Sequence, residues 1–508
     1  MGLAKVRTST LNGIEATPVE VEVKASDQGS NFTIIGLADN AIREARDRVA
    51  TAIFQSGFRL PGRVLVNLAP AELRKEGAAF DAAIAIGILV ASHQFKPQNI
   101  GGVSIHGELS LSGMLKPVRG ATAFAIRAFE DRMDCVLVPS HNLGEARLIN
   151  EVRSYGIRSL KEMVQCLAGD WSQTEEAIPP MGENERARTS SALLSLDDVR
   201  GQSIAKRALM IAAVGGHNLL MIGPPGCGKS MLAERFPTLL PPLTLREKIE
   251  VLKIHSACGN RLEKILDGER PFRSPHHVIS DAGLMGGGSN PRPGEVSLAH
   301  RGVLFLDEFP EFRRSTLEAL RAPLETGKVT ITRARANMTF PARIQLIAAM
   351  NPCPCGRLGD KRCKCSAISI QKYFSKLSEP ILDRIDLQVE LDPVAVGEML
   401  ASDHGSAPRA NQIVANIEMA KDFCASRQQG QNCLLQLQEL MEQSEKAPIV
   451  GILEKVSAAG RLSARGYVRV LRVARSIADL EATPKIQSRH VIEALGLRGL
   501  ERLKRWVQ

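Results

Sequence analysis

One segment restricts the possible folds of this 508-residue chain more than any other: GPPGCGKS, at residues 223–230. It fits the pattern G-x-x-x-x-G-K-[S/T] and stands between an apolar stretch typical of a buried strand, residues 218–222, and a stretch typical of a helix. Glycines there let the backbone wrap a phosphate closely, and the exposed amides and the helix start favour negative charge. The sequence therefore predicts an α/β core that holds a nucleoside triphosphate.

The residues of this loop have different expected roles. We expect Lys229 to reach the β- and γ-phosphates of ATP, and Ser230 to bind Mg²⁺. Cys227 occupies a position at which the pattern tolerates any residue. The expected nucleotide-binding set is Gly223, Pro224, Pro225, Gly226, Cys227, Gly228, Lys229, Ser230 and Met231.

Two further apolar stretches end in polar side chains that suit hydrolysis. VLFLDE, residues 303–308, predicts a buried strand followed by Asp307 as a Mg²⁺ partner and Glu308 as the group that polarises the attacking water. LIAAMN, residues 346–351, has the same form, and we expect Asn351 to orient that water. Acids at strand ends are also common on surfaces, so the catalytic interpretation depends on their position after the phosphate loop.

Phosphoryl transfer also needs positive charge on the transition state beyond one lysine. Arg384, in EPILDRIDL, and Arg465, at the start of a predicted helix in LSARGY, are the candidates. Most arginines are surface residues, so both assignments depend on the resemblance described below.

The remaining chain divides into domains around this core. Residues 1–168 alternate strand-like and helical stretches and predict a small α/β domain, whereas residues 169–192, rich in charge and with two prolines, predict a linker. Residues 193–393 form the expected core, and residues 394–508 a helical lid. The first fifteen residues lack the apolar centre of a signal peptide, and no apolar stretch is long enough for a bilayer, so we expect a cytoplasmic protein without membrane contact.

The C-terminal part of the chain is basic. Residues 445–508 contain 13 Lys and Arg against 6 Asp and Glu, a difference of +7 within a formal net charge of +10. A basic surface attracts phosphate backbones, but a solvated basic helix face fits the same count.

Long motifs carry a family resemblance: DVRGQ (198–202), GGHNLLMIGPPGCGKS (215–230), RPFRSPHH (270–277), PGEVSLAHRGVLFLDEFPEF (293–312), LRAPLETGKVTITRA (320–334), AAMNPCPCG (348–356) and LDRIDL (382–387). On these the chain resembles the magnesium-chelatase-like AAA+ family called YifB or ComM. The resemblance implies a homo-hexameric ring that hydrolyses ATP to ADP and phosphate, depends on DNA, and has helicase or branch-migration activity in recombination or natural transformation. The alternative is a chelatase-type or chaperone-like ATPase that remodels a protein partner.

The resemblance also assigns roles to individual residues. It implies that Arg384 acts on a neighbouring subunit's nucleotide, that Arg465 is a second sensor, and that residues 199–202 flank the adenine. It places a hairpin, KVTITRARANMTF, in a central pore, where Lys328, Arg333 and Arg335 offer cations to single-stranded or branched DNA. A solvated hairpin is the alternative. His276 and His277 precede a glycine-rich insert, and a metal site is not expected from two adjacent histidines.

The N-terminal domain resembles the Lon protease fold (S5 domain 2-like) through LAPAELRKEGAAFDAAIAIGIL (68–89) and HGELSLSGMLKPVRGA (106–121). Ala79 stands where that family carries its nucleophilic serine, and no lysine stands near residues 121–125. Without a hydroxyl and a base, acyl transfer has no route. We therefore expect a non-proteolytic scaffold or DNA-binding platform.

Four cysteines form a cluster directly after Asn351. Cys353, Cys355, Cys363 and Cys365 have the spacing C-x-C-x7-C-x-C on a short loop. Four thiolates there suit a closed, structural Zn²⁺ site, although zinc more often takes C-x-x-C pairs. Zinc and reduced thiols both remain open at this point.

Overall fold

The computed structural model describes residues 2–36, 40–72, 75, 77–172, 194–288, 291–333, 336–393, 409–428, 430–458 and 464–499. These residues form two compact units: residues 1–184 with residues 244–268, and residues 185–243 with residues 269–508. The expected linker, residues 169–192, lies outside the described residues from residue 173 onward.

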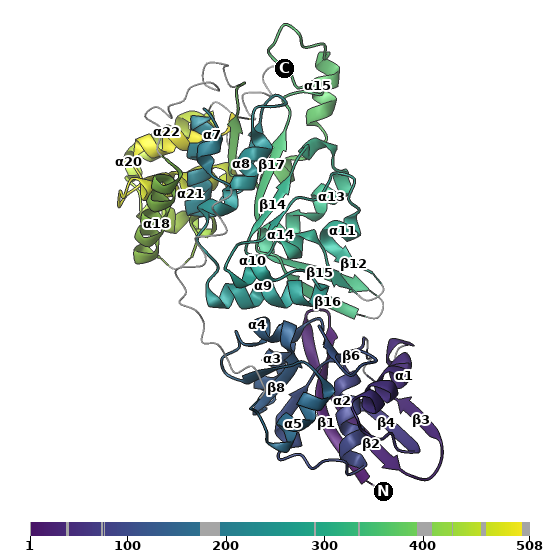
Figure 1. The fold of residues 1–508 in the computed structure, drawn as a ribbon. Coiled ribbons are helices and arrows are strands. Elements are labelled where there is room, and N and C mark those ends of the chain that lie inside the picture. The colour runs from purple at the N-terminus through teal and green to yellow at the C-terminus, as the bar shows by residue number, and fades with distance from the viewer. Residues whose placement is uncertain are drawn as a thin grey trace. The chain divides into compact units, whose positions relative to one another are not determined.

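The first unit contains a mixed sheet with the strand order β3-β4-β2-β1-β5-β8-β9 (Figure 1). β1 pairs antiparallel with β2, and β2 with β4, whereas β5, β8 and β9 are parallel neighbours. A tight turn at Gly13, with φ of 67°, joins β1 to β2. The strands are β1 (Gly2–Asn12), β2 (Glu15–Ser26), β3 (Asn31–Ile35), β4 (Arg63–Ala69), β5 (Val103–Ile105), β6 (Glu108–Leu109), β7 (Leu115–Lys116), β8 (Cys135–Pro139) and β9 (Arg153–Ile157).

The most apolar helix of this unit, α2 (Asp81–Ala91), packs across β1 and β2. Nearly every side chain of α2 is buried, which explains why its sequence is apolar on all sides. A Cβ at Gly87 would lie 2.5 Å from Val23 Cγ2, so this close helix–sheet approach requires glycine. The other helices are α1 (Asn40–Gln55), α3 (Ala121–Glu130), α4 (Leu143–Ala146), α5 (Leu160–Ala168), α9 (Leu245–Cys258) and α10 (Glu263–Leu266).

The second unit contains a parallel sheet with the strand order β11-β14-β17-β10-β18. Its central strands are buried throughout and apolar except for Gln345, as expected for strands covered on both faces. The strands are β10 (Leu219–Ile222), β11 (Phe272–Arg273), β14 (Val303–Leu306), β17 (Gln345–Met350) and β18 (Leu387–Glu390); two hairpins are formed by β12 (Gly286–Gly287) with β13 (Arg292–Pro293), and by β15 (Lys328–Arg333) with β16 (Ala336–Pro341).

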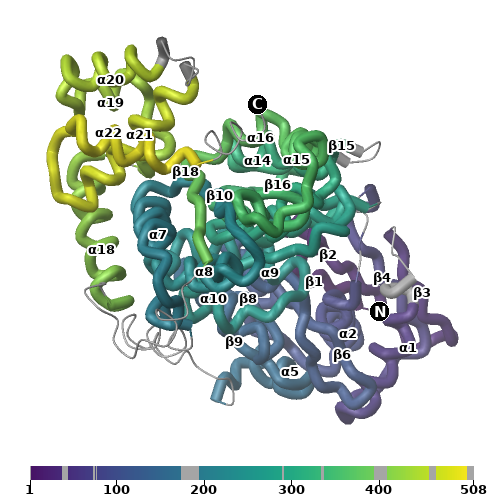
Figure 2. The backbone as a smooth tube through the Cα atoms, turned by 90° about the horizontal axis from the view of Figure 1, so that it is seen from above, coloured from purple at the N-terminus to yellow at the C-terminus, as the bar shows by residue number. Residues whose placement is uncertain are grey.

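The helices of the second unit lie before, between and after the strands of this sheet in the sequence. They are α7 (Ser203–Gly215), α8 (Lys229–Arg235), α11 (Asp281–Met285), α12 (Glu295–Leu298), α13 (Arg314–Ala319), α14 (Arg321–Thr326), α15 (Ala367–Phe374), α16 (Glu379–Leu382), α18 (Ala410–Arg427), α19 (Leu437–Glu442), α20 (Lys446–Ala458), α21 (Ala464–Leu480) and α22 (Ser488–Gly496). Figure 2 shows α19 to α22 gathered together, and α21 also packs against α7.

The expected fold class is confirmed: an α/β P-loop core of the AAA+ type is followed by helices. A 3-10 turn at Asn432–Leu434 precedes α19. No helix in the described part of the chain has both the length and the apolar character needed to cross a bilayer.

Candidate ATPase site

The expected ATP-site residues meet at the carboxyl edge of the parallel sheet. β10, β14 and β17 are followed respectively by the phosphate loop, by Asp307 and Glu308, and by Asn351. Ile222 pairs with Met350, and the Gly223 N–H donates to the Met350 carbonyl at 3.1 Å. Ligands of open parallel sheets bind at this edge.

The phosphate loop has the backbone that its glycines permit. Gly226 and Gly228 have φ values of 82° and 94°, which other residues rarely adopt. Among the described residues, no heavy atom outside the loop neighbours lies within 4 Å of where a Cβ at either glycine would stand. The space next to these two glycines is therefore open among the described residues.

Lys229 lies at the centre of the site and is 8% exposed. Its Nζ donates to the carbonyls of Gly223 (2.7 Å) and Pro224 (2.9 Å) and lies 3.3 Å from Asn351 Oδ1. Burial lowers the pKa of Lys229, and the neighbouring Cys227 and Asp307 oppose this shift. The ammonium of Lys229 therefore binds two backbone carbonyls, which a bound phosphate would replace.

Ser230 and Asp307 provide paired oxygen atoms beside Lys229. Ser230 Oγ donates to Asp307 Oδ2 at 2.9 Å, and Asp307 Oδ1 accepts the Glu308 N–H at 2.8 Å. A hydroxyl and a carboxylate are ligands that Mg²⁺ prefers. These two residues therefore fit the expected magnesium site.

Glu308 has an unexpected partner. Its Oε2 lies 3.1 Å from His277 Nδ1, and its backbone has the left-handed φ of 51°. Strand register explains the pairing: Phe272 of β11 pairs with Val303 of β14, and His277 and Glu308 each follow five residues later. The sequence pattern at His277 had suggested only the question of a metal site and gave no sign of this contact.

Gln202 ties the segment at residues 199–202 to the phosphate loop. Its Nε2 donates to the Cys227 carbonyl at 3.1 Å and to the Asp392 carbonyl at 2.7 Å. The segment expected beside the adenine thus borders the phosphate loop and the residues that follow β18.

Of the two candidate arginines, Arg384 is paired with an acid outside the group around Lys229. Arg384 donates to Glu325 of α14 at 2.7 Å, and this bond, with the nearby charge of Arg465, lowers the pKa of Glu325. In the described part of the chain, the side-chain hydrogen bonds of Arg384 reach only Glu325 and the Pro380 carbonyl. Among the residues that the structure describes, no hydrogen bond or ion pair joins either arginine to the group around Lys229.

The β15–β16 hairpin has one buried and one exposed face. Val329 and Ile331 are buried, whereas Lys328, Thr330 and Thr332 are exposed. Arg335 and the side chain of Arg333 lie outside the described residues. Lys328 is therefore the described cation on the exposed face of this hairpin.

Much of the basic charge of α21 is internal. Arg475 is fully buried, where it binds Asp479 and the carbonyls of Thr483 and Pro484. Arg469 is buried beside Asp383 at 3.1 Å. Arg475 therefore binds within α21 and the turn after it, and Arg469 joins α21 to the residue after α16. Neither interpretation of the +7 excess predicted buried arginines.

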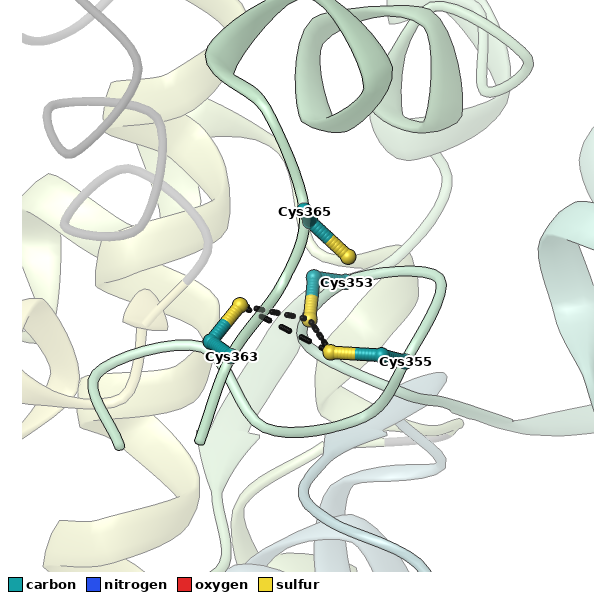
Figure 3. A group of neighbouring side chains, drawn as sticks. All are labelled: Cys353, Cys355, Cys363 and Cys365. Carbon is teal, nitrogen blue, oxygen red and sulfur yellow. Dashed lines mark hydrogen bonds between the residues drawn. The ribbon is translucent and has the colours of Figure 1, made fainter. Parts of the chain in front are cut away.

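The four clustered cysteines converge (Figure 3). Their Sγ atoms all lie within 4.8 Å of one another, and Cys353 is buried. Cys353 lies 3.4 Å from Cys355 and 3.9 Å from Cys363, and Cys355 lies 3.6 Å from Cys363. None of the ten cysteines of the chain forms a disulfide.

The first unit has buried polar groups, but they are directed into its interior. His106 is fully buried, stacks on Phe124 and hydrogen-bonds Ser104 at 2.8 Å. Burial lowers the pKa of His106 to about 3. Lys75 is also buried and donates to the Pro70 carbonyl. These groups hold the unit together and are shielded from substrates.

Comparison with known proteins places this fold and site. Residues 195–399 match the family described as magnesium chelatase, subunit ChlI; residues 20–142 match subunit ChlI of Mg-chelatase, and residues 408–498 match its C-terminal family. The chain is 40% identical over 510 residues to the competence protein ComM of Haemophilus influenzae, with 99% of each chain covered. It is 39% identical over 512 residues to the uncharacterized protein YifB of Escherichia coli, covering 99% of this chain and 98% of YifB. A maternal DNA replication licensing factor, mcm6 of Xenopus tropicalis, is 23% identical over 292 residues, covering 56% of this chain and 32% of mcm6.

The parallel sheet, the phosphate loop and these similarities define a P-loop ATPase of the AAA+ class. Within that class, the chain belongs to the magnesium-chelatase-like YifB/ComM family.

Proposed function

We propose that this chain is a ring-forming AAA+ motor that couples ATP hydrolysis to movement on DNA, with branch migration in recombination or natural transformation as its task. The observation that carries the proposal is the 40% identity, over 99% of both chains, to a protein named for competence. The similarity to a DNA replication licensing factor supports DNA as the substrate.

In this proposal, different residues of the chain bind the phosphates, the metal and the attacking water. Lys229 would bind the β- and γ-phosphates, Ser230 and Asp307 would hold the metal, and Glu308 and Asn351 would orient the attacking water. Mg²⁺, when bound, would neutralise charge on the phosphate oxygens. Arg384 would act on a neighbouring subunit's nucleotide, and Arg465 would act as the second sensor.

In this proposal, Glu308 can polarise the attacking water only if its carboxylate can leave His277. Their contact joins two partly exposed side chains, 30% exposed for His277 and 56% for Glu308. Such pairs are worth about 0–1 kcal/mol, so nucleotide or DNA contacts can break this one. The pair therefore provides a resting position for the water-polarising group.

ATP turnover with different partners tests the proposal. We expect a four-way DNA junction to raise the rate of phosphate release above that with no DNA. Lys328→Ala would weaken this stimulation, whereas the exposed lysine variant Lys446→Ala, in the lid, would preserve it. A rate that no DNA changes, but that a protein partner raises, would favour the chelatase-type or chaperone-like alternative.

The expected ring is tested separately. Light scattering of the Glu308→Gln variant with ATP and magnesium should give a mass near six chains. A monomer under those conditions would contradict the ring and with it the action of Arg384 across an interface.

A further inference from the structure

The cysteine cluster has the geometry of a single metal ion. In a regular tetrahedron with metal–sulfur bonds of about 2.3 Å, neighbouring sulfurs stand about 3.8 Å apart. The three measured Sγ separations, 3.4, 3.6 and 3.9 Å, lie around this value. Iron–sulfur clusters hold their thiolates further apart because several irons stand between them, so the spacing favours one ion.

The loop itself is shaped to bring the thiols together. The Gly356 N–H donates to the Cys353 carbonyl at 2.9 Å, which closes a turn around the first cysteine pair. The Cys363 N–H donates to the Asp360 carbonyl at 2.9 Å, which closes a second turn before the other pair. Two turns therefore replace the C-x-x-C spacing that zinc loops more often use.

The same loop lies against the nucleotide site. A Cβ at Gly356 would stand 2.6 Å from Pro225 Cδ in the phosphate loop and 3.8 Å from Asn351 Cγ. Tyr373 of α15 is buried, which raises the pKa of its hydroxyl, and the backbone of Asn351 opposes this shift. The cysteine loop thus contacts both the phosphate loop and the residue expected to orient water.

We propose that Cys353, Cys355, Cys363 and Cys365 bind one Zn²⁺, and that this ion fixes residues 351–366 against Pro225 and thereby holds Asn351 in place for nucleotide. With four protein thiolates the ion has no open position, so its role is structural. The link to nucleotide rests on the proposed ATPase function, whereas zinc binding does not.

The metal content of the purified protein tests whether the four cysteines bind zinc. Protein purified without added metal should contain one zinc per chain by mass spectrometry, and cobalt exchanged into the site should show the absorption of a tetrahedral thiolate complex. The Cys363→Ser/Cys365→Ser double variant should lose the metal, and Cys258→Ser, at the end of α9, should retain it. A zinc-free wild-type protein with four more titratable thiols, or a double variant that keeps its zinc, would overturn the site.

Nucleotide affinity tests whether the bound zinc supports the nucleotide site. Zinc released from the wild-type protein by a mercurial and chelator should weaken binding of a fluorescent ATP analogue by about tenfold, and zinc added after thiol reduction should restore it. This measurement needs no variant to fold. Unchanged affinity after zinc release would overturn the coupling.

The Gly356→Ala variant distinguishes zinc binding from its effect on nucleotide binding. Its Cβ would press on Pro225, and its φ of 75° disfavours alanine, so we expect weaker ATP binding with zinc retained. Equal affinity in this variant would contradict the contact as the route of coupling. A wild-type chain that holds zinc but binds no ATP would instead overturn the proposed function and leave the metal site standing.

Discussion

Replacement of Lys229 by methionine isolates the charge at the centre of the site. Methionine keeps most of the apolar stem of this buried side chain and removes the ammonium, which now donates to two carbonyls and lies near Asn351. With ATP bound, the ammonium would exchange these partners for phosphate oxygens. Hydrogen bonds to charged groups are worth about 1.5–3 kcal/mol, so we expect ATP to bind about 10- to 150-fold more weakly.

The free protein should respond differently. Burial lowers the pKa of Lys229, which means that its charge costs stability in the absence of ligand. Lys229→Met should therefore melt at the same temperature as the wild type or higher, while calorimetry shows the loss of ATP affinity. Lys248→Met is the matched control, because Lys248 also donates to a backbone carbonyl, that of Leu266 at 2.9 Å. ATP binding by Lys229→Met within about twofold of the wild type would refute this reasoning.

Three further predictions concern other parts of the chain. Neither Arg384→Ala nor Lys229→Ala should hydrolyse ATP alone, but mixed subunits should recover part of the rate if Arg384 acts across an interface; no recovery in mixed rings would contradict that role. Lys328→Ala should weaken binding to branched DNA at low salt and reduce the salt dependence in a filter-binding assay, and an unchanged salt slope would exclude this lysine as a phosphate contact. The pKa of His106 is lowered from 6.5 to about 3, so its stabilising contribution is complete above pH 6.5 and decreases as the pH falls toward 3, by about 1.4 kcal/mol at pH 5.5. Hydrogen exchange of the first unit should show this loss in the wild type and in His141→Gln, an exposed control, but not in His106→Gln; an identical pH response in all three would contradict it.

The grouping of the expected ATP-site residues could be predicted because its signals are local. Each expected residue lies in a segment that follows a short apolar strand, and parallel strands bring their carboxyl ends to one edge. The motif therefore specified Lys229, Ser230, Asp307 and Asn351 without any knowledge of long-range contacts, and the structure brings these four together.

The contact between His277 and Glu308 had no such signal. It depends on the register between β11 and β14, and β11 is only two residues long. A strand of that length has no recognisable periodicity, so the sequence could not show which residues would face each other.

The lid arginines illustrate a different limit. A charge count sums buried and exposed groups alike, and Arg475 is buried because Asp479, one helical turn later, can neutralise it. The i,i+4 spacing of this pair is visible in the sequence, but whether it faces the core or the solvent depends on the neighbouring helices. In the same way, nothing in residues 244–268 distinguishes them from the surrounding core, yet they belong to the first unit.

The most direct test of the central claim is ATP binding and phosphate release by the Glu308→Gln variant beside the wild type, with magnesium present. We expect both proteins to bind ATP with similar affinity, and only the wild type to release phosphate. Release by the variant at the wild-type rate, or the absence of ATP binding by the wild-type protein, would contradict the assignment of this site.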